Sequence, residues 1–319
     1  MKRLDRSISI VCALEVRKKS PHTSGAQTKN SSSDPDVSRL ATFGARLQRE
    51  DPLRVSVPLW QTKRIMKLVV LGSGTSIPHA RRAASGYWLE TEGGTILLDI
   101  SADIPHRLAQ EELDWPNLDA IWISHFHLDH LGGLAPFLFG TRNAPEVRER
   151  TRPLRVYGPS GFVNILQAIN ESNDYRLLQQ PFPVELKEVD PGDEFELLPG
   201  INCVAFATPH TKESLAIRLT DKRGSVLVYT SDTGPSVQLE EFAAGADLLL
   251  TECSFPRNKP VKTHLELADA MRLAQKAQPK ILLLSHLYPE WDGIDLAAEA
   301  RKLWAGQTVA AFDGLRLDF

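Results

Sequence analysis

The chain has 319 residues, with 37 lysines and arginines against 40 aspartates and glutamates, so its formal net charge is −3. With 42% hydrophobic and 24% charged residues, it has the composition of a folded protein and not that of collagen or a coiled coil. Its three cysteines form no CxxC pair, which excludes a disulfide framework and a thiolate metal cage. No apolar run approaches the ~20 residues that span a bilayer. We therefore expect a cytoplasmic protein with no membrane segment.

Residues 1–65 differ from the rest of the chain. They hold 13 basic and 6 acidic side chains, which leaves 24 basic and 34 acidic ones, a net charge of −10, in residues 66–319. A region this acidic is not expected to bind a polyanion over its general surface, because nucleic-acid affinity depends on lysines and arginines. The first 65 residues lack periodicity and contain the polar stretch Thr28–Ser33. We expect either a disordered tail or a mis-assigned start, with Met66 as the true first residue, and one folded domain over 66–319.

From Met66 onward, short apolar runs alternate with helix-like segments. The predicted strands are Leu68–Leu71, Thr95–Asp99, Ala120–Ser124, Leu154–Tyr157, Val184–Val189, Asn202–Thr208, Leu215–Leu219, Val226–Thr230, Asp247–Thr251, Ile281–Ser285 and Val309–Phe312. The predicted helices are Gly161–Asn170, Leu265–Gln275 and Asp295–Trp304. Runs such as Val226–Val228 are apolar at every position, as in strands buried on both faces. The pattern predicts sheets enclosed between layers of helices.

The strongest functional signal directly follows the predicted strand 120–124. His125, His127, Asp129 and His130 lie within six residues and are followed by two glycines. A strand end holds side chains rigidly, and a glycine turn lets neighbouring side chains point into one volume. Imidazole and carboxylate are the groups that Zn²⁺ and similar ions prefer. The alternative is a polar loop that carries these histidines by chance, and three of the nine histidines in six positions argue against it.

Three later residues stand in the same setting, just past a predicted strand: His210, Asp232 and His286. Taken singly, each could be a surface residue or part of a turn. Together with the first group they make seven candidate ligands, whereas one zinc ion needs four, or three and an open position. Seven ligands that include one bridging carboxylate suit two metal ions.

This pattern resembles the ligand signature of the metallo-β-lactamase superfamily of two-metal hydrolases. The resemblance covers about residues 66–319 and implies an α/β fold, an αββα sandwich of two mixed β-sheets flanked by helices. It implies two Zn²⁺ ions, with Mn²⁺ or Fe²⁺ as alternatives. The implied ligands are His125, His127 and His210 at the first ion and Asp129, His130 and His286 at the second, with Asp232 bridging.

Within the superfamily, the chain is most similar to the ribonuclease Z branch. The segments Leu71–Pro78 and Ala246–Phe255, and the later His264, carry this likeness. It implies cleavage of a phosphodiester, with precursor tRNA or a smaller ester as substrate, and a homodimer. Asp129 would orient the attacking water, and His264 would assist catalysis. The alternative for His264 is a surface position at a helix start, because Thr263 and Glu266 have the spacing of a capping box.

The chain departs from that branch in several places. Residues 158–210 contain no basic, glycine-rich arm of the kind that grips tRNA, and Leu265 and Glu266 replace the usual Ser-Thr pair. The one basic cluster, at residues 142–155, is interleaved with glutamates, and we interpret it as a solvated loop. Two other function classes stay open. One is a lactonase or β-lactamase that uses the same ligands on a carbonyl substrate, and the other is a metal-binding protein without catalysis.

Overall fold

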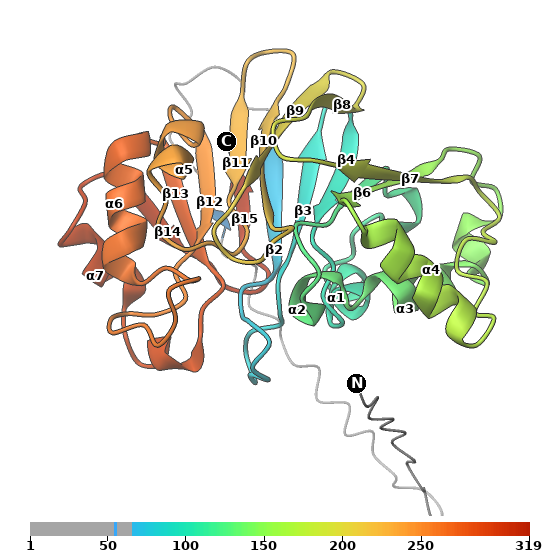
Figure 1. Cartoon of the computed structure of the whole chain (residues 1–319), viewed down its shortest axis with the longest axis horizontal. Coiled ribbons are helices and arrows are strands. Elements are labelled where there is room, and N and C mark those ends of the chain that lie inside the picture. The colour runs from blue at the N-terminus through green and yellow to red at the C-terminus, as the bar shows by residue number, and fades with distance from the viewer. Residues whose placement is uncertain (1–53, 56–65) are drawn as a thin grey trace, which may run out of the picture. The chain divides into compact units, whose positions relative to one another are not determined.

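Two mixed β-sheets form the centre of the computed structural model, which describes residues 54–55 and 66–319 (Figure 1). The first sheet has the strand order β1-β15-β2-β3-β4-β5-β6-β7. Its strands are β1 (Arg54–Val55), β2 (Lys67–Gly72), β3 (Gly86–Thr91), β4 (Gly94–Leu98), β5 (Ala120–Trp122), β6 (Leu154–Pro159), β7 (Val184–Val189) and β15 (Arg316–Asp318).

The second sheet has the order β14-β13-β12-β11-β10-β9-β8. Its strands are β8 (Glu194–Leu198), β9 (Ile201–Ala207), β10 (Leu215–Thr220), β11 (Val226–Tyr229), β12 (Leu248–Glu252), β13 (Ile281–Ser285) and β14 (Gln307–Ala310). In each sheet a run of antiparallel strands leads into a parallel run, β4 to β7 in the first and β11 to β14 in the second. Parallel strands share an edge for their carboxyl ends, which is where α/β proteins place ligand sites.

Helices cover the outer face of each sheet, with α1 to α4 beside the first and α5 to α7 beside the second (Figure 1). The helices are α1 (Ile104–Gln110), α2 (Leu128–Leu131), α3 (Leu134–Thr141), α4 (Phe162–Ser172), α5 (Val237–Phe242), α6 (Leu267–Ala277) and α7 (Leu296–Arg301), with short 3₁₀ turns η1 (Trp115–Asn117), η2 (Pro145–Val147) and η3 (Pro289–Trp291). The predicted αββα sandwich of two mixed sheets is confirmed.

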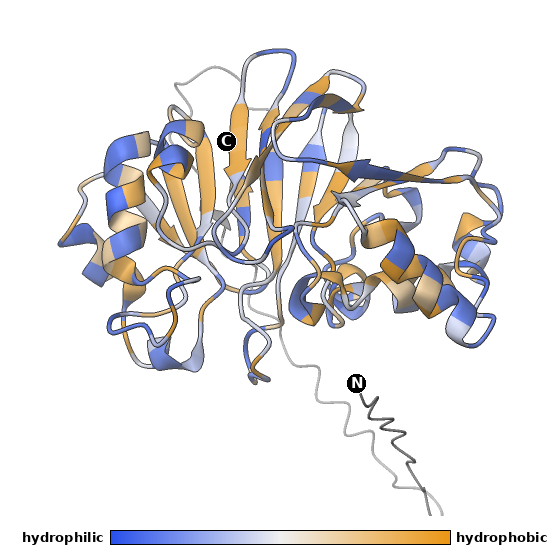
Figure 2. Ribbon diagram, viewed as in Figure 1, coloured by the Kyte–Doolittle hydropathy of each residue, from blue (hydrophilic) through white to orange (hydrophobic). Residues whose placement is uncertain are grey.

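Strand residues alternate between the two sides of their sheet. In β2, Leu68 and Val70 belong to the core between the sheets, whereas Val69 and Leu71 pack under the helices. All four are at most 3% exposed. Figure 2 accordingly shows the strands largely in the hydrophobic colour and the helices with one hydrophilic side. Burial on both faces explains why the run Leu68–Leu71 is apolar at every position.

The expected boundary at residue 65 stays a prediction. Of residues 1–65 the structure describes only Arg54–Val55, which pair in parallel with β15; the rest of the expected tail lies outside the described residues. Among the helices of residues 66–319, none is long and apolar enough to cross a membrane.

Candidate metal centre

All seven predicted ligands lie at the edge where strands of the two sheets end. His125 and His127 follow β5, and Asp129 and His130 lie in the single helical turn α2. The other three follow β9, β11 and β13, which run in the same direction. Gly133 makes the return after α2 possible, because a Cβ there would lie 2.1 Å from the carbonyl oxygen of Ser101.

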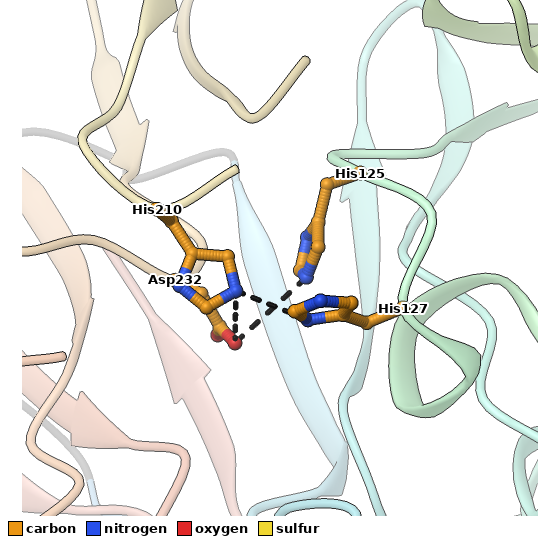
Figure 3. Close-up of side chains that lie close together, drawn as sticks. All are labelled: His125, His127, His210 and Asp232. Carbon is orange, nitrogen blue, oxygen red and sulfur yellow. Dashed lines mark hydrogen bonds and ion pairs between the residues drawn. The ribbon is translucent and has the colours of Figure 1, made fainter. Parts of the chain in front are cut away.

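Four of the side chains converge on one point: His125, His127, His210 and Asp232 (Figure 3). His210 Nε2 lies 3.0 Å from His127 Nδ1. Asp232 Oδ2 lies 3.6 Å from His210 Nε2 and 3.8 Å from His125 Nε2. Three imidazole nitrogens and one carboxylate oxygen at this spacing are a donor set that could hold a divalent metal ion.

A second cluster lies on the other side of Asp232. Its Oδ1 atom is 3.3 Å from His130 Nε2 and 3.3 Å from His286 Nε2. Asp129 Oδ2 lies 3.6 Å from His286 Nε2. The two oxygens of Asp232 therefore face two different sets of imidazoles.

Four of the polar atoms that point into these clusters have no hydrogen-bond partner within the described residues. His125 Nε2, His130 Nε2, His286 Nε2 and Asp232 Oδ1 are buried and unpaired within the described residues. Buried polar atoms are normally satisfied, because leaving one unpaired costs about 1–3 kcal/mol. Four such atoms directed into one volume fit divalent metal ions.

In four of the candidate histidine ligands, the ring nitrogen that faces away from the clusters contacts another group of the protein. The contacts are His125 Nδ1 to Ser124 Oγ at 3.0 Å, His130 Nδ1 to Asp99 Oδ2 at 2.7 Å, His210 Nδ1 to the Thr263 carbonyl at 2.9 Å, and His286 Nδ1 to Ser254 Oγ at 3.0 Å. Such contacts fix the ring orientation and raise the basicity of the nitrogen that would bind metal.

Asp99 is a site residue that the sequence analysis missed. It is fully buried, and its carboxylate accepts hydrogen bonds from the Ser124 backbone N–H at 2.7 Å, the Ser124 hydroxyl at 2.7 Å and the Tyr229 hydroxyl at 2.6 Å, besides its contact with His130. The available signal was its place at a strand end, directly after β4, the setting shared by the predicted ligands.

Burial and charge favour the metal-binding forms of two of these groups. Burial lowers the pKa of His125 well below its ordinary value, which keeps the imidazole neutral at neutral pH. For Asp232, burial alone would raise the pKa, but the charges of His286 and His130 outweigh it and hold the pKa well below the ordinary value. Neutral imidazole and ionised carboxylate are the forms that bind metal.

His264 lies against both groups of histidines. Its ring centroid is 4.8 Å from that of His210 and 5.4 Å from that of His286. His264 Nδ1 lies 3.0 Å from Oε1 of Glu252, a buried carboxylate that also accepts the backbone N–H groups of Thr233 at 2.6 Å and Leu265 at 2.9 Å. Burial alone would lower the pKa of His264, but the hydrogen bond and charge of Glu252 raise it above the ordinary value.

The alternative reading of His264 as a helix-start residue is wrong in its local geometry. Helix α6 begins at Leu267 with Glu266 as its N-cap, and the capping box joins Glu266 to Asp269 and does not involve Thr263. His264 therefore lies before the helix and takes no part in its cap. Its side chain points inward and is 10% exposed.

Three arginines of the basic cluster at residues 142–155 are bonded to other parts of the protein. Arg150 donates to the carbonyls of Pro116 at 2.8 Å and Leu118 at 2.7 Å. Arg152 and Arg155 form ion pairs with Asp119 and Glu185, at 2.8 and 3.1 Å. These guanidinium groups therefore do not form an open phosphate-binding surface.

The chain matches the family described as Anti-Pycsar protein Apyc1 over residues 66–305. It is 24% identical to a ribonuclease Z of Archaeoglobus fulgidus, with 80% of this chain and 98% of the relative covered. It is 30% identical to the uncharacterized protein ML1173 of Mycobacterium leprae, with 79% and 88% covered. The crystal structure of the metallo-β-lactamase fold protein YhfI from Bacillus subtilis superposes with a TM-score of 0.66 at 25% identity, over 79% of this chain and 98% of that one. The predicted likeness to the ribonuclease Z branch is confirmed.

Proposed function

Because the chain belongs to the family described as Anti-Pycsar protein Apyc1, we propose that it cleaves a phosphodiester with two divalent metal ions held at the edge of its sheets. It is a metal-dependent hydrolase of the ribonuclease Z-like branch of the metallo-β-lactamase fold.

The observation that carries the two-ion proposal is the position of Asp232. One of its oxygens faces His125 and His210, and the other faces His130 and His286. A carboxylate between two sets of imidazoles suits two adjacent ions that share it as a ligand. The proposed ligands are His125, His127 and His210 for the first ion, Asp129, His130 and His286 for the second, and Asp232 for both.

Two Zn²⁺ ions, or Mn²⁺ or Fe²⁺ in their place, would lower the pKa of a shared water and neutralise the charge on the phosphate oxygens. The chain's own residues supply the rest. Asp129 lies at the second cluster, and its side chain is only 10% exposed. It orients the attacking water and accepts its proton.

His264 is proposed to assist departure of the leaving oxygen. Glu252 holds its Nδ1 at 3.0 Å, which fixes the ring and stabilises its protonated form. A ring nitrogen of His264 lies within 4.8 Å of ligand atoms of Asp232 and His286, so the proton is available at the reacting phosphate. Proton donation from a positioned side chain contributes about a hundredfold or more to a rate.

We propose a small phosphodiester as the substrate in preference to precursor tRNA. The chain lacks a basic arm in residues 158–210, and the arginines at 150, 152 and 155 are bonded to the protein itself. Phosphates of a long polyanion need free basic side chains, which this cluster does not offer. A homodimer stays a prediction.

The test uses the full chain loaded with Zn²⁺ or Mn²⁺, and Asp129→Ala as the blank. The substrates are bis(4-nitrophenyl) phosphate, a 3′-extended tRNA precursor, a lactone and a β-lactam. We expect cleavage of the phosphate ester and two metal ions per chain by mass spectrometry of the metal content. Cleavage of the lactone or β-lactam without the ester would overturn the proposal, and cutting of the precursor would overturn its substrate preference.

A further inference from the structure

A cavity of about 900 Å³ opens beside the metal centre, and Asp129 forms part of its wall. Its other walls come from residues 75–84, which follow β2, and from residues 101–110, which include α1. Ligand pockets commonly have volumes of about 300–1,000 Å³. A scissile phosphate at the metal centre fills only a small part of this space, so the cavity has room for the rest of the substrate.

The carboxylates in the wall are already bonded to the protein. Asp313 accepts hydrogen bonds from the Ser73 backbone N–H, the Ser73 hydroxyl and the Ala83 backbone N–H, at 2.7 to 2.9 Å. Asp103 accepts the Ala84 backbone N–H at 3.3 Å. Asp129 faces His286. Their acceptor atoms are thus turned largely toward backbone and side-chain donors of the wall itself.

The basic groups on the loop 75–84 outnumber the carboxylate that holds them. Arg82, whose side chain is 12% exposed, donates to Asp292 Oδ1 at 2.8 Å, and His79 contacts Asp292 Oδ2 at 2.9 Å. Arg81 lies 3.7 Å from the same Oδ1 atom and is 75% exposed. One carboxylate cannot neutralise two guanidinium groups, so the charge of Arg81 is left over at the cavity.

A second candidate donor lies on the α1 wall. His106 is exposed, lines the cavity, and its ring has no hydrogen-bond or ionic partner within the described residues. Arg107 on the same helix is different, because its guanidinium is bonded to the Leu71 carbonyl and to Glu111, both at 2.9 Å. The cavity therefore presents two donors from different elements: His106, which is unpaired within the described residues, and Arg81, whose one ion-pair contact is with the carboxylate that also binds Arg82.

We propose that this cavity is a subsite for a second anionic group of the substrate, a phosphate next to the scissile phosphodiester, and that Arg81 and His106 bind it. Guanidinium and imidazole donors form charge-assisted hydrogen bonds with phosphate, and arginine does so in bidentate geometry. The inference rests on the proposed function, because it places the scissile phosphate at the metal centre beside Asp129.

A binding experiment tests the subsite without turnover. Calorimetry on the Zn²⁺-loaded full chain compares thymidine 3′,5′-bisphosphate with thymidine 5′-monophosphate. A charge-assisted contact contributes enough that we expect the bisphosphate to bind about tenfold tighter. Arg81→Gln and His106→Gln should each reduce this ratio toward one. Arg148→Gln, which changes an exposed arginine outside the cavity, should leave it unchanged.

A kinetic experiment uses a matched pair of esters, thymidine 5′-(4-nitrophenyl phosphate) with and without a 3′-phosphate. In the wild-type chain we expect a lower KM for the 3′-phosphorylated ester than for the plain ester. In Arg81→Gln and in His106→Gln the two esters should have equal KM values, and kcat on the plain ester should be unchanged. Equal affinities in the wild-type chain, or a preference that survives both substitutions, would overturn the subsite. A binding preference without cleavage of either ester would support the subsite and refute the phosphodiesterase proposal.

Discussion

The two halves of the metal centre are built by different means. In the half next to the first sheet, four candidate ligands come from one stretch, residues 125–130. In the other half, His210, Asp232 and His286 come from three loops that follow β9, β11 and β13, strands of the second sheet that run in the same direction. Both groups of ligands offer imidazole and carboxylate donors. The first group is close together in the sequence, whereas the second is brought together only when the second sheet has formed.

Each half also contains a buried carboxylate, and the two carboxylates have different neighbours. Asp99 holds His130, a candidate ligand, and is supported by Ser124 and Tyr229. Glu252 holds His264, the candidate proton donor. We therefore expect the first carboxylate to govern metal affinity and the second to govern the rate of the chemical step.

The largest expected effect comes from the one side chain that both clusters share. In Asp232→Ala, both ions lose a ligand, so the metal content should fall from two ions per chain to none and ester cleavage to the level of the blank. Mass spectrometry of the purified variant measures the metal content. Retention of one ion with full occupancy would show that Asp232 does not bridge.

The next effect separates rate from metal binding. Glu252→Gln and His264→Ala should each lower kcat by about a hundredfold while both ions are retained, because a positioned acid is lost. The double variant should be no worse than the more damaging single one, since residues that act as a unit are not additive. Loss of an ion in His264→Ala would instead make His264 a ligand.

A smaller effect is expected at Asp99. Asp99→Asn should weaken metal affinity by about tenfold, as substitutions behind a ligand do, with kcat at saturating metal little changed. Competition with a chelator measures the affinity. The exposed Asp174, which forms an ion pair with Arg176, offers the control Asp174→Asn. A loss of kcat without loss of affinity would refute the contrast between Asp99 and Glu252.

The smallest effect concerns the contacts of Asp292 with His79 and Arg82 of the loop 75–84. Hydrogen bonding to His79 and then Arg82 lowers the pKa of Asp292, so its contribution to stability is complete above the ordinary value of about 4 and is lost as the pH falls through the lowered one. Asp292→Asn should lower the Tm by about 2 °C or less at pH 7. An equal difference at pH 7 and in acid would contradict this assignment.

Sequence patterns predicted the parts of the fold that depend on local apolar runs. The buried strands β11, β12 and β13 were predicted within about two residues of their bounds, because each contains an unbroken apolar run, at 226–229, 248–250 and 281–284. Strands β3 and β8 were not predicted, since polar residues such as Thr91, Glu194 and Glu196 interrupt their apolar pattern. Helix α1 was missed because it spans only seven residues and carries a proline in its first turn.

In the candidate site too, the sequence predicted the residues that have a local signal and missed those that have none. The stretch 125–130 is a visible motif, and a polar residue after an apolar strand is a visible position. Asp99 occupies such a position too, but it belongs to no motif, and Glu252 lies in the segment 246–255 that carries the family likeness without being singled out there. Their importance depends on side-chain contacts: Glu252 contacts His264, twelve residues later, and Asp99 contacts Tyr229, 130 residues later. Those contacts exist only in the folded protein.

The placement of the donors has a consequence for the life of the protein in the cell. The ligands are divided between loops of the two sheets. Two bound metal ions would therefore link one sheet to the other. A ligand that binds only the folded state stabilises it by mass action, so the folded population depends on the supply of metal. In a metal-starved cell the chain would open more often and be degraded faster. Its abundance would therefore follow the metal supply even at constant synthesis.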